Sequence, residues 1–198
     1  MEDCGSDSSR ELLKAIADDQ FGALFMSENV GQHRAYLVGL QYVDTGHAGL
    51  MDGDLQDRPE SLPILYTALS ECDVVFAQRS GRTSMGSALL KGLFRLLSGG
   101  RLPPKVGTNM VLGSEAVRFL QGFSNPDPYL IGILALSGLS LSAVEVERDP
   151  PRGPSSYNLK GRLMMGLRTL RGSGLVPWLP VPIRPGRVKV AERWWWPA

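Results

Sequence analysis

Short apolar stretches alternate with amphipathic helical segments along most of this chain, and this pattern decides its fold class. The stretches that we expect to form strands are residues 21–26, 47–51, 73–78, 109–112 and 143–147. Helices are expected over about residues 31–43, 62–69, 87–97, 114–121 and 129–136, and a capping box at residues 8–11 opens another. Strands and helices that alternate in this way build a sheet covered by helices. The sequence therefore predicts an α/β protein.

The composition excludes several classes of protein. At 198 residues, with 43% hydrophobic and 21% charged residues, the chain has the size and composition of one globular domain. A formal net charge of +1 gives little of the attraction on which nonspecific nucleic-acid binding depends, so we expect no nucleic-acid partner. Cys4 and Cys72 are too few for a disulfide framework, and no run of about 18 apolar residues predicts a transmembrane helix. The N-terminus has no signal-peptide pattern, so we expect a cytoplasmic protein.

Residues 50–60 (LMDGDLQDRPE) carry a carboxylate-rich turn between a predicted strand and a predicted helix. Asp52 and Asp54 follow the strand, and Gln56 adds an amide oxygen to the same turn. We expect Asp57 to cap the helix that follows. Oxygen ligands of this kind suit Mg²⁺ or Mn²⁺, either of which can bridge the oxygens of a diphosphate. A solvated acidic loop is the alternative for a bare Asp-x-Asp pair, but the surrounding residues make the metal site the more specific hypothesis.

The same turn resembles the metal-binding turn of family-2 glycosyltransferases that load sugars onto polyprenyl phosphates. These are the dolichol-phosphate mannose synthase-like and bactoprenol glucosyltransferase-like enzymes. Further segments are similar to motifs of that family in the same order: residues 2–8 (EDCGSDS), 29–35 (NVGQHRA), 74–79 (VVFAQR), 147–148 (ER) and 153–159 (GPSSYNL). The resemblance covers about residues 2–170. It implies a GT-A fold, the Rossmann-like sheet of nucleotide-diphospho-sugar transferases.

The resemblance also implies an activity and a set of site residues. The implied enzyme is a hexosyltransferase that moves a sugar from a nucleotide-sugar donor to a polyprenyl (dolichyl or undecaprenyl) phosphate acceptor, with inversion and with Mg²⁺ or Mn²⁺ as cofactor. The implied metal ligands are Asp52, Asp54 and Gln56. The implied catalytic residues are Asp54, Arg79 and Arg148. The implied substrate-binding residues are Asp3, Asp52, Gln56, Arg79, Arg148 and Ser156.

The chain departs from the family pattern in two respects. The family starts with a strand, a helix and a second strand, whereas residues 2–8 correspond to the exit of that second strand. We therefore expect an N-terminally truncated sheet that lacks its first strand–helix unit and folds poorly alone. Residues 107–110 (GTNM) replace the family's Gly-Asp-Phe-Arg, and Ser156 replaces a lysine. A catalytically inactive fragment or a binding subunit is therefore the alternative, and an unrelated Mg²⁺-dependent phosphohydrolase is a third hypothesis.

The C-terminal part of the chain changes in character. Leucines at 159, 163, 167 and 170 fall on one helical stripe flanked by basic residues. Such a helix can lie on an anionic membrane surface, and an ordinary surface helix packed on the domain is the alternative. Residues 172–198 lack periodicity and are rich in proline and tryptophan. We expect a glycosyltransferase domain over residues 1–171, a tail over residues 172–198, and peripheral contact with the cytoplasmic face of a membrane.

Overall fold

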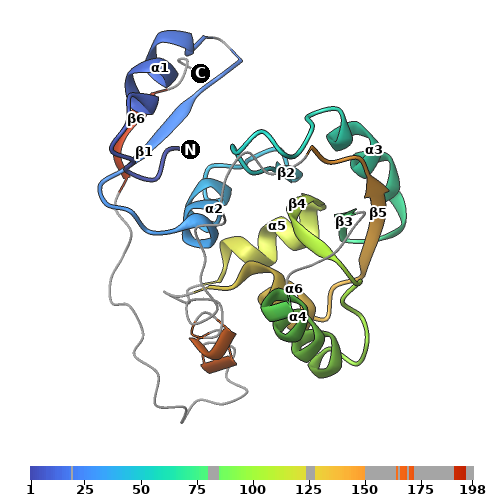
Figure 1. Cartoon of the computed structure of the whole chain (residues 1–198). Coiled ribbons are helices and arrows are strands. Elements are labelled where there is room, and N and C mark those ends of the chain that lie inside the picture. The colour runs from blue at the N-terminus through green and yellow to red at the C-terminus, as the bar shows by residue number, and fades with distance from the viewer. Residues whose placement is uncertain are drawn as a thin grey trace. The chain divides into compact units, whose positions relative to one another are not determined.

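The computed structural model of the chain describes residues 1–18, 20–79, 85–123, 128–149, 164, 166–168, 170–171 and 190–194. The chain forms two compact units (Figure 1). We call Met1–Tyr42 with Arg184–Ala198 the terminal unit, and Val43–Ile183 the central unit. Each unit has a β-sheet of its own. The α/β fold class predicted from the sequence is confirmed.

The terminal unit is built on a two-stranded antiparallel sheet of β1 (Ala23–Met26) and β6 (Val190–Trp194). Its helices are α1 (Ser9–Ile16) and α2 (Gln32–Leu40). All four residues of β1 are buried, which explains why this stretch is continuously apolar rather than alternating. The pairing of β6 with β1 was not predicted, because residues 172–198 were expected to form a tail.

The central unit contains a four-stranded mixed sheet with the order β2-β4-β3-β5. The strands are β2 (Ala48–Leu50), β3 (Val74–Arg79), β4 (Val106–Leu112) and β5 (Leu141–Val146). The helices are α3 (Ser61–Ala68), α4 (Met85–Leu97), α5 (Ser114–Gln121) and α6 (Leu130–Leu136), with a 3₁₀ turn at Leu69–Glu71. β4 runs antiparallel to both of its neighbours, and β3 runs parallel to β5. As a result β2, β3 and β5 all point in the same direction.

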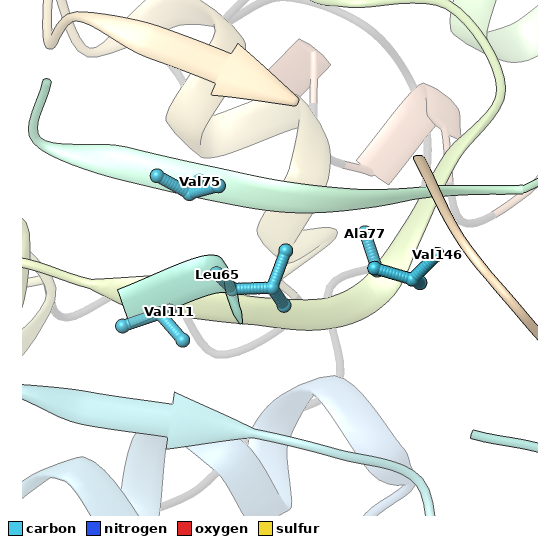
Figure 2. Close-up of a cluster of buried hydrophobic side chains, with 5 residues drawn as sticks. All are labelled: Leu65, Val75, Ala77, Val111 and Val146. Atoms are coloured by element: carbon cyan, nitrogen blue, oxygen red, sulfur yellow. The ribbon is translucent and has the colours of Figure 1, made fainter. Parts of the chain in front are cut away.

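The two central strands of this sheet, β3 and β4, are buried on both faces. The cluster on the α3 side consists of Leu65, Val75, Ala77, Val111 and Val146 (Figure 2). Because side chains alternate along a strand, Val74 and Phe76 of β3 point to the opposite face, and both are fully buried. Helices α5 and α6 contact β4, and α4 packs on α6. The sheet therefore lies between α3 and the group formed by α4, α5 and α6.

Over the described residues, the predicted helices and strands are confirmed within a few residues at their ends. The capping predictions are wrong. The Ser8 side chain makes no cap hydrogen bond to α1, and the amide of Ser9 donates to Asp7 Oδ1 instead (3.1 Å). The N-cap of α3 is Glu60 rather than Asp57, and the Asp57 carboxylate instead accepts a charge-assisted hydrogen bond from Arg148.

The predicted amphipathic helix over residues 159–171 can be compared with the structure only in part. Residues 164, 166–168 and 170–171 are helical, and the rest of that segment lies outside the described residues. Across the part of the chain that the structure describes, no helix combines the length and the apolarity that a membrane crossing requires.

Two helical glycines allow a matched test of packing around α4 and α6. A Cβ on Gly132 of α6 would lie 2.7 Å from Phe94 Cζ and 2.8 Å from Tyr129 Cδ1, whereas a Cβ on Gly92 of α4 would meet open space. We expect Gly92→Ala to raise the free energy of unfolding by about 0.5–1 kcal/mol through helix propensity. Gly132→Ala should lower it by about 1–3 kcal/mol through overpacking. Urea denaturation of both variants measures this difference. If both substitutions changed the free energy of unfolding in the same direction, the packing described here would be contradicted.

Candidate active site

The carboxyl ends of β2, β3 and β5 lie at one edge of the central sheet, since these three strands point in the same direction. Asp52 follows β2 by two residues, and Arg148 follows β5 by two residues. Arg79 is the last residue of β3, opposite Val146 in the parallel pair with β5. In sheets of this kind, ligands bind outside the carboxyl ends of the strands. The topology thus brings predicted site residues from three distant segments to one edge.

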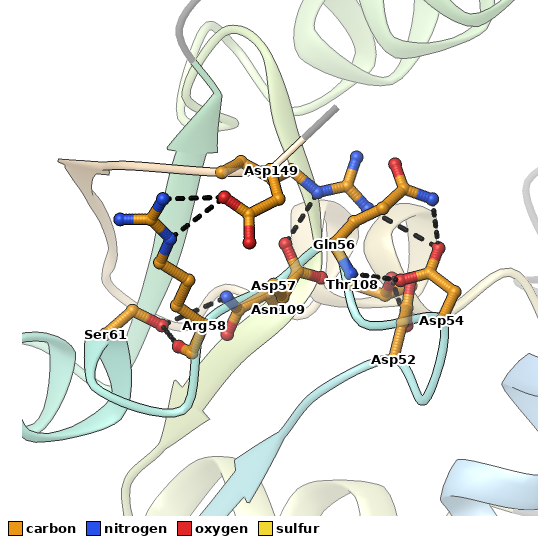
Figure 3. Close-up of polar contacts among 10 residues, drawn as sticks. Asp52, Asp54, Gln56, Asp57, Arg58, Ser61, Thr108, Asn109 and Asp149 are labelled. Carbon is orange, nitrogen blue, oxygen red and sulfur yellow. Dashed lines mark hydrogen bonds and ion pairs between the residues drawn. The ribbon is translucent and has the colours of Figure 1, made fainter. Parts of the chain in front are cut away.

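Asp52 is held by a threonine from the neighbouring strand (Figure 3). Thr108 Oγ1 lies 2.8 Å from Asp52 Oδ1 and 2.9 Å from Oδ2, so the hydroxyl can donate to either oxygen. The antiparallel register, in which Leu50 lies opposite Met110, extends to bring Asp52 opposite Thr108. Thr108 occupies the place of the acid expected from the resemblance. A hydroxyl there donates a hydrogen bond to Asp52, whereas a carboxylate would repel it.

Asp54 lies at the exposed side of the turn and is surrounded by donors. Its side chain is 43% exposed. The backbone amide of Gln56 donates to Asp54 Oδ1 (3.1 Å), and the side-chain Nε2 of Gln56 donates to Oδ2 (2.5 Å). Arg148 Nη2 lies 3.8 Å from the same Oδ2. Asp54 therefore remains accessible while it interacts with two of the other predicted site residues.

Asp57 and Arg148 form a buried ion pair next to the turn. Arg148 Nε donates to Asp57 Oδ1 at 2.7 Å, and the two side chains are 17% and 3% exposed, respectively. Asp57 Oδ2 has no hydrogen-bond partner among the described residues. The main chains also meet, through a bridge between Asp57 and Arg148 and a hydrogen bond from Asp149 N to Gln56 O (2.9 Å). The turn is therefore fixed to the segment after β5 by both backbone and side chains.

An exposed arginine joins the same two segments at the outer side of the turn. Arg58 Nη2 lies 2.6 Å from Asp149 Oδ1, and its Nη1 lies 2.6 Å from Glu147 Oε2. Hydrogen bonding and charge attraction from Asp149, with a smaller effect of Glu147, raise the pKa of Arg58 above its ordinary value. Exposed pairs of this kind contribute little to stability, so this cluster supplements the buried Asp57–Arg148 pair.

A buried amide anchors the start of α3 on the sheet. Asn109 Nδ2 donates to Ser61 Oγ at 3.2 Å, and Ser61 Oγ donates to the carbonyl of Arg58 at 2.7 Å. Asn109 and Thr108 both belong to residues 107–110, where the chain departs from the family pattern. The motif gives the position of this segment, but the supporting role of the two side chains depends on their contacts with Ser61 and Asp52, which no sequence pattern indicates.

The oxygen atoms of the turn fit a hard divalent cation. Asp52 and Asp54 supply two carboxylates, and Gln56 can supply its carbonyl oxygen once its amide turns away from Asp54. Within the described residues, no cluster of three or more His, Cys, Asp or Glu side chains could hold a metal ion. Most of the coordination would therefore come from water and ligand oxygens, which is usual for Mg²⁺. The metal site remains a prediction for which the turn has suitable chemistry.

Two predicted site residues, Asp3 and Ser156, are described separately from this group. Asp3 belongs to the terminal unit, where its Oδ1 accepts from the amide of Val30 and its Oδ2 from the amide of Gly31, both at 2.7 Å. Gly31 has a φ of +82°, a conformation that favours glycine, and Asp3 thus shapes the loop before α2. Ser156 lies outside the described residues. Their predicted contacts to substrate remain predictions.

The chain belongs to glycosyl transferase family 2. The sequence model of that family matches residues 1–114, which is more than half of the chain. This confirms the family expected from the motifs.

Among curated proteins, the chain is similar to an uncharacterized glycosyltransferase of Bacillus subtilis (strain 168), YkcC. The two are 26% identical over 177 residues, which cover 84% of this chain and 55% of that protein. It is also similar to the undecaprenyl-phosphate 4-deoxy-4-formamido-L-arabinose transferases of Yersinia pestis (strain Pestoides F) and Yersinia pseudotuberculosis serotype O:3 (strain YPIII). Each is 36% identical over 86 residues, 41% of this chain and 26% of the relative. The chain thus spans 55% or less of the length of these relatives.

Proposed function

We propose that this chain is a metal-dependent glycosyltransferase domain that moves a sugar from a nucleotide-sugar donor to a polyprenyl phosphate. The observation that carries the proposal is the group at the carboxyl edge of the central sheet, where accessible Asp54 lies between Gln56 and Arg148. Such a group can bind a diphosphate through both a cation and an arginine. The family membership supports the transferase activity, and the names of the Yersinia relatives support the polyprenyl-phosphate acceptor.

Each site residue has a distinct task in this proposal. Asp52, Asp54 and Gln56 would hold Mg²⁺ or Mn²⁺, and a bound cation would supply positive charge to offset the charge that develops on the nucleoside diphosphate. Arg148 and Arg79 donate charge-assisted hydrogen bonds to phosphate oxygens, in a fork geometry that lysine cannot reproduce.

Two further contacts to substrate are proposed from the resemblance alone. Asp3 contacts the nucleotide, and Ser156 contacts a phosphate. Both roles come from the resemblance of their segments to motifs of the family.

The acceptor requires little help from a general base. A polyprenyl phosphate is ionised at neutral pH, so its oxygen can attack the anomeric carbon without transferring a proton to the protein. The histidines agree with this, since His33 is buried in α2 and the ring of His47 packs edge-on against Tyr66. The bond formed joins the acceptor phosphate oxygen to the sugar, and the bond broken releases the nucleoside diphosphate. An acceptor of this kind places the reaction at a membrane, and we propose peripheral contact at its cytoplasmic face.

A transfer assay tests the proposal. The 198-residue chain is incubated with Mn²⁺, a set of nucleotide sugars and a short-chain polyprenyl phosphate. Thermal unfolding is recorded first, because a sheet without its first strand–helix unit is expected to fold poorly alone. If the chain unfolds cooperatively, we expect one donor to yield a glycosyl polyprenyl phosphate detectable by mass spectrometry, and chelation with EDTA to stop its formation. Absence of both transfer and Mn²⁺-dependent binding of a nucleoside diphosphate would contradict the proposal.

A second candidate function is a binding subunit that holds the donor without transferring the sugar. Thr108 favours it, because this threonine occupies the place of the family's acid and is engaged with Asp52. The same assay separates the two candidates. Mn²⁺-dependent donor binding without transfer by any donor tested would indicate the binding subunit.

A further inference from the structure

Asp57 is a deeply buried carboxylate at the candidate active site, and its position in the sequence suggested a different role. Its side chain is 3% exposed, and its partner is the guanidinium of Arg148. A buried charge is costly unless it is paired. Asp57 does not serve as the cap of α3, since Glu60 occupies that position. What this carboxylate contributes must therefore involve Arg148.

The way in which the two side chains meet determines where the rest of the guanidinium points. Arg148 uses Nε to reach Asp57 Oδ1 at 2.7 Å, rather than placing both Nη groups on the carboxylate. Its Nη2 is then 3.8 Å from Asp54 Oδ2, beyond hydrogen-bond distance but within the range of an ion pair. Asp57 Oδ2 stays without a hydrogen-bond partner among the described residues. The guanidinium is thus anchored at one side by a buried acid and faces an exposed acid at the other.

The backbone makes this geometry rigid. Asp57 and Arg148 are bridged across the two segments, and the amide of the next residue, Asp149, donates to Gln56 O at 2.9 Å. With both main chains fixed, a 2.7 Å charge-assisted bond at Nε leaves the guanidinium little freedom to rotate. Preorganisation of this kind improves binding because less side-chain entropy is lost when the ligand arrives.

We propose that Asp57 is a positioning residue, which holds Arg148 by its Nε so that the Nη edge faces Asp54 and the diphosphate bound there. The inference rests on the proposed function, in which Arg148 binds phosphate. Asp57 itself does not touch the ligand. Its effect on ligand affinity should therefore depend on the presence of Arg148, whereas a general contribution to folding would not.

A double-mutant cycle tests the coupling, because residues that act through each other have non-additive effects. The affinity of the 198-residue chain for inorganic diphosphate in the presence of Mn²⁺ is measured by calorimetry for wild type, Asp57→Asn, Arg148→Gln and the double variant. Asn keeps the shape of Asp57 and loses its charge. We expect Asp57→Asn to weaken binding about 10-fold, and the double variant to bind no more weakly than Arg148→Gln alone.

The chain offers a matched control in the exposed pair that joins the same two segments. Asp149→Asn removes the charge that faces Arg58 and should change diphosphate affinity less than about twofold, since exposed pairs are worth little. Thermal unfolding of every variant is recorded alongside. If Asp57→Asn shows no cooperative transition, the cycle is run with Asp57→Glu, which keeps the charge and displaces the carboxylate by one methylene. It should then weaken binding only when Arg148 is present.

The outcomes separate this inference from the proposed function. If wild type does not bind diphosphate with Mn²⁺, the proposed function fails and the role of Asp57 fails with it. Diphosphate binding by wild type that Asp57→Asn leaves unchanged would overturn the positioning role alone. A loss of diphosphate affinity that is equally large with and without Arg148 would also overturn it. Asp57 would then act by stabilising the fold.

Discussion

Replacing Asp54 by alanine is expected to abolish Mn²⁺-dependent binding of a nucleoside diphosphate. The variant removes the more exposed of the two carboxylates of the turn and leaves Asp52, whose oxygens lie within 2.9 Å of Thr108 Oγ1. It also removes the negative charge that separates Arg148 from an incoming cation, since Arg148 Nη2 lies 3.8 Å from Asp54 Oδ2. The variant loses a charged metal ligand and leaves the cation facing the positive charge of Arg148. The Mn²⁺-dependent affinity for nucleoside diphosphate should therefore fall by about 100-fold or more.

Calorimetric titration of nucleoside diphosphate, with and without Mn²⁺, measures this effect. Glu60→Ala is the matched control, because it also removes one exposed carboxylate from the same connection between β2 and α3. Its affinity should stay within about twofold of wild type, since an exposed charge away from the ligand acts weakly through water. Equal affinities in wild type and Asp54→Ala would show that the turn does not bind the cation.

The largest effect on stability is expected from Phe76→Ala. Phe76 lies in β3, between β4 and β5, and its ring is fully buried. Deleting a buried phenyl ring removes its burial energy and leaves a cavity, which together cost about 3–5 kcal/mol. Because whole domains are stable by only about 5–15 kcal/mol, this variant should unfold at a much lower urea concentration.

Tyr66→Ala provides the comparison for Phe76→Ala. Tyr66 is an aromatic residue of α3 that is 56% exposed and whose ring contacts His47 edge-on. Its removal should lower the free energy of unfolding by about 1 kcal/mol or less. Urea denaturation measured by circular dichroism gives both values. A loss below about 1 kcal/mol for Phe76→Ala would contradict the central position of β3.

The helices and strands could be predicted from the sequence because local patterns determine them. Within the strand predicted at residues 73–78, residues 74–77 (VVFA) are continuously apolar, as a strand buried on both faces should be. The strand β6 was missed for the opposite reason. Residues 190–194 (VAERW) are few, follow a proline-rich segment, and become a strand only through pairing with β1.

The site could be predicted where its residues are neighbours in the sequence. Asp52, Asp54 and Gln56 belong to one turn, so their closeness in the sequence already places them close together in space. The partners of the turn come from distant segments, so no local pattern indicates them. Thr108 contacts Asp52 because of the register between β2 and β4. Asp57, which was expected to cap α3, is paired with Arg148. These contacts depend on tertiary structure, which propensity and spacing do not contain.

The pairing of β1 with β6 has a consequence for how the protein is made. Residues 23–26 emerge from the ribosome about 160 residues before their partner, which at about 5–20 residues per second is a delay of roughly 8–30 s. During that time β1, an apolar strand that is fully buried in the finished protein, lacks its neighbour. Unpaired apolar edges of this kind attract other chains. We therefore expect the sheet of the terminal unit to form late in synthesis, after β6 has emerged.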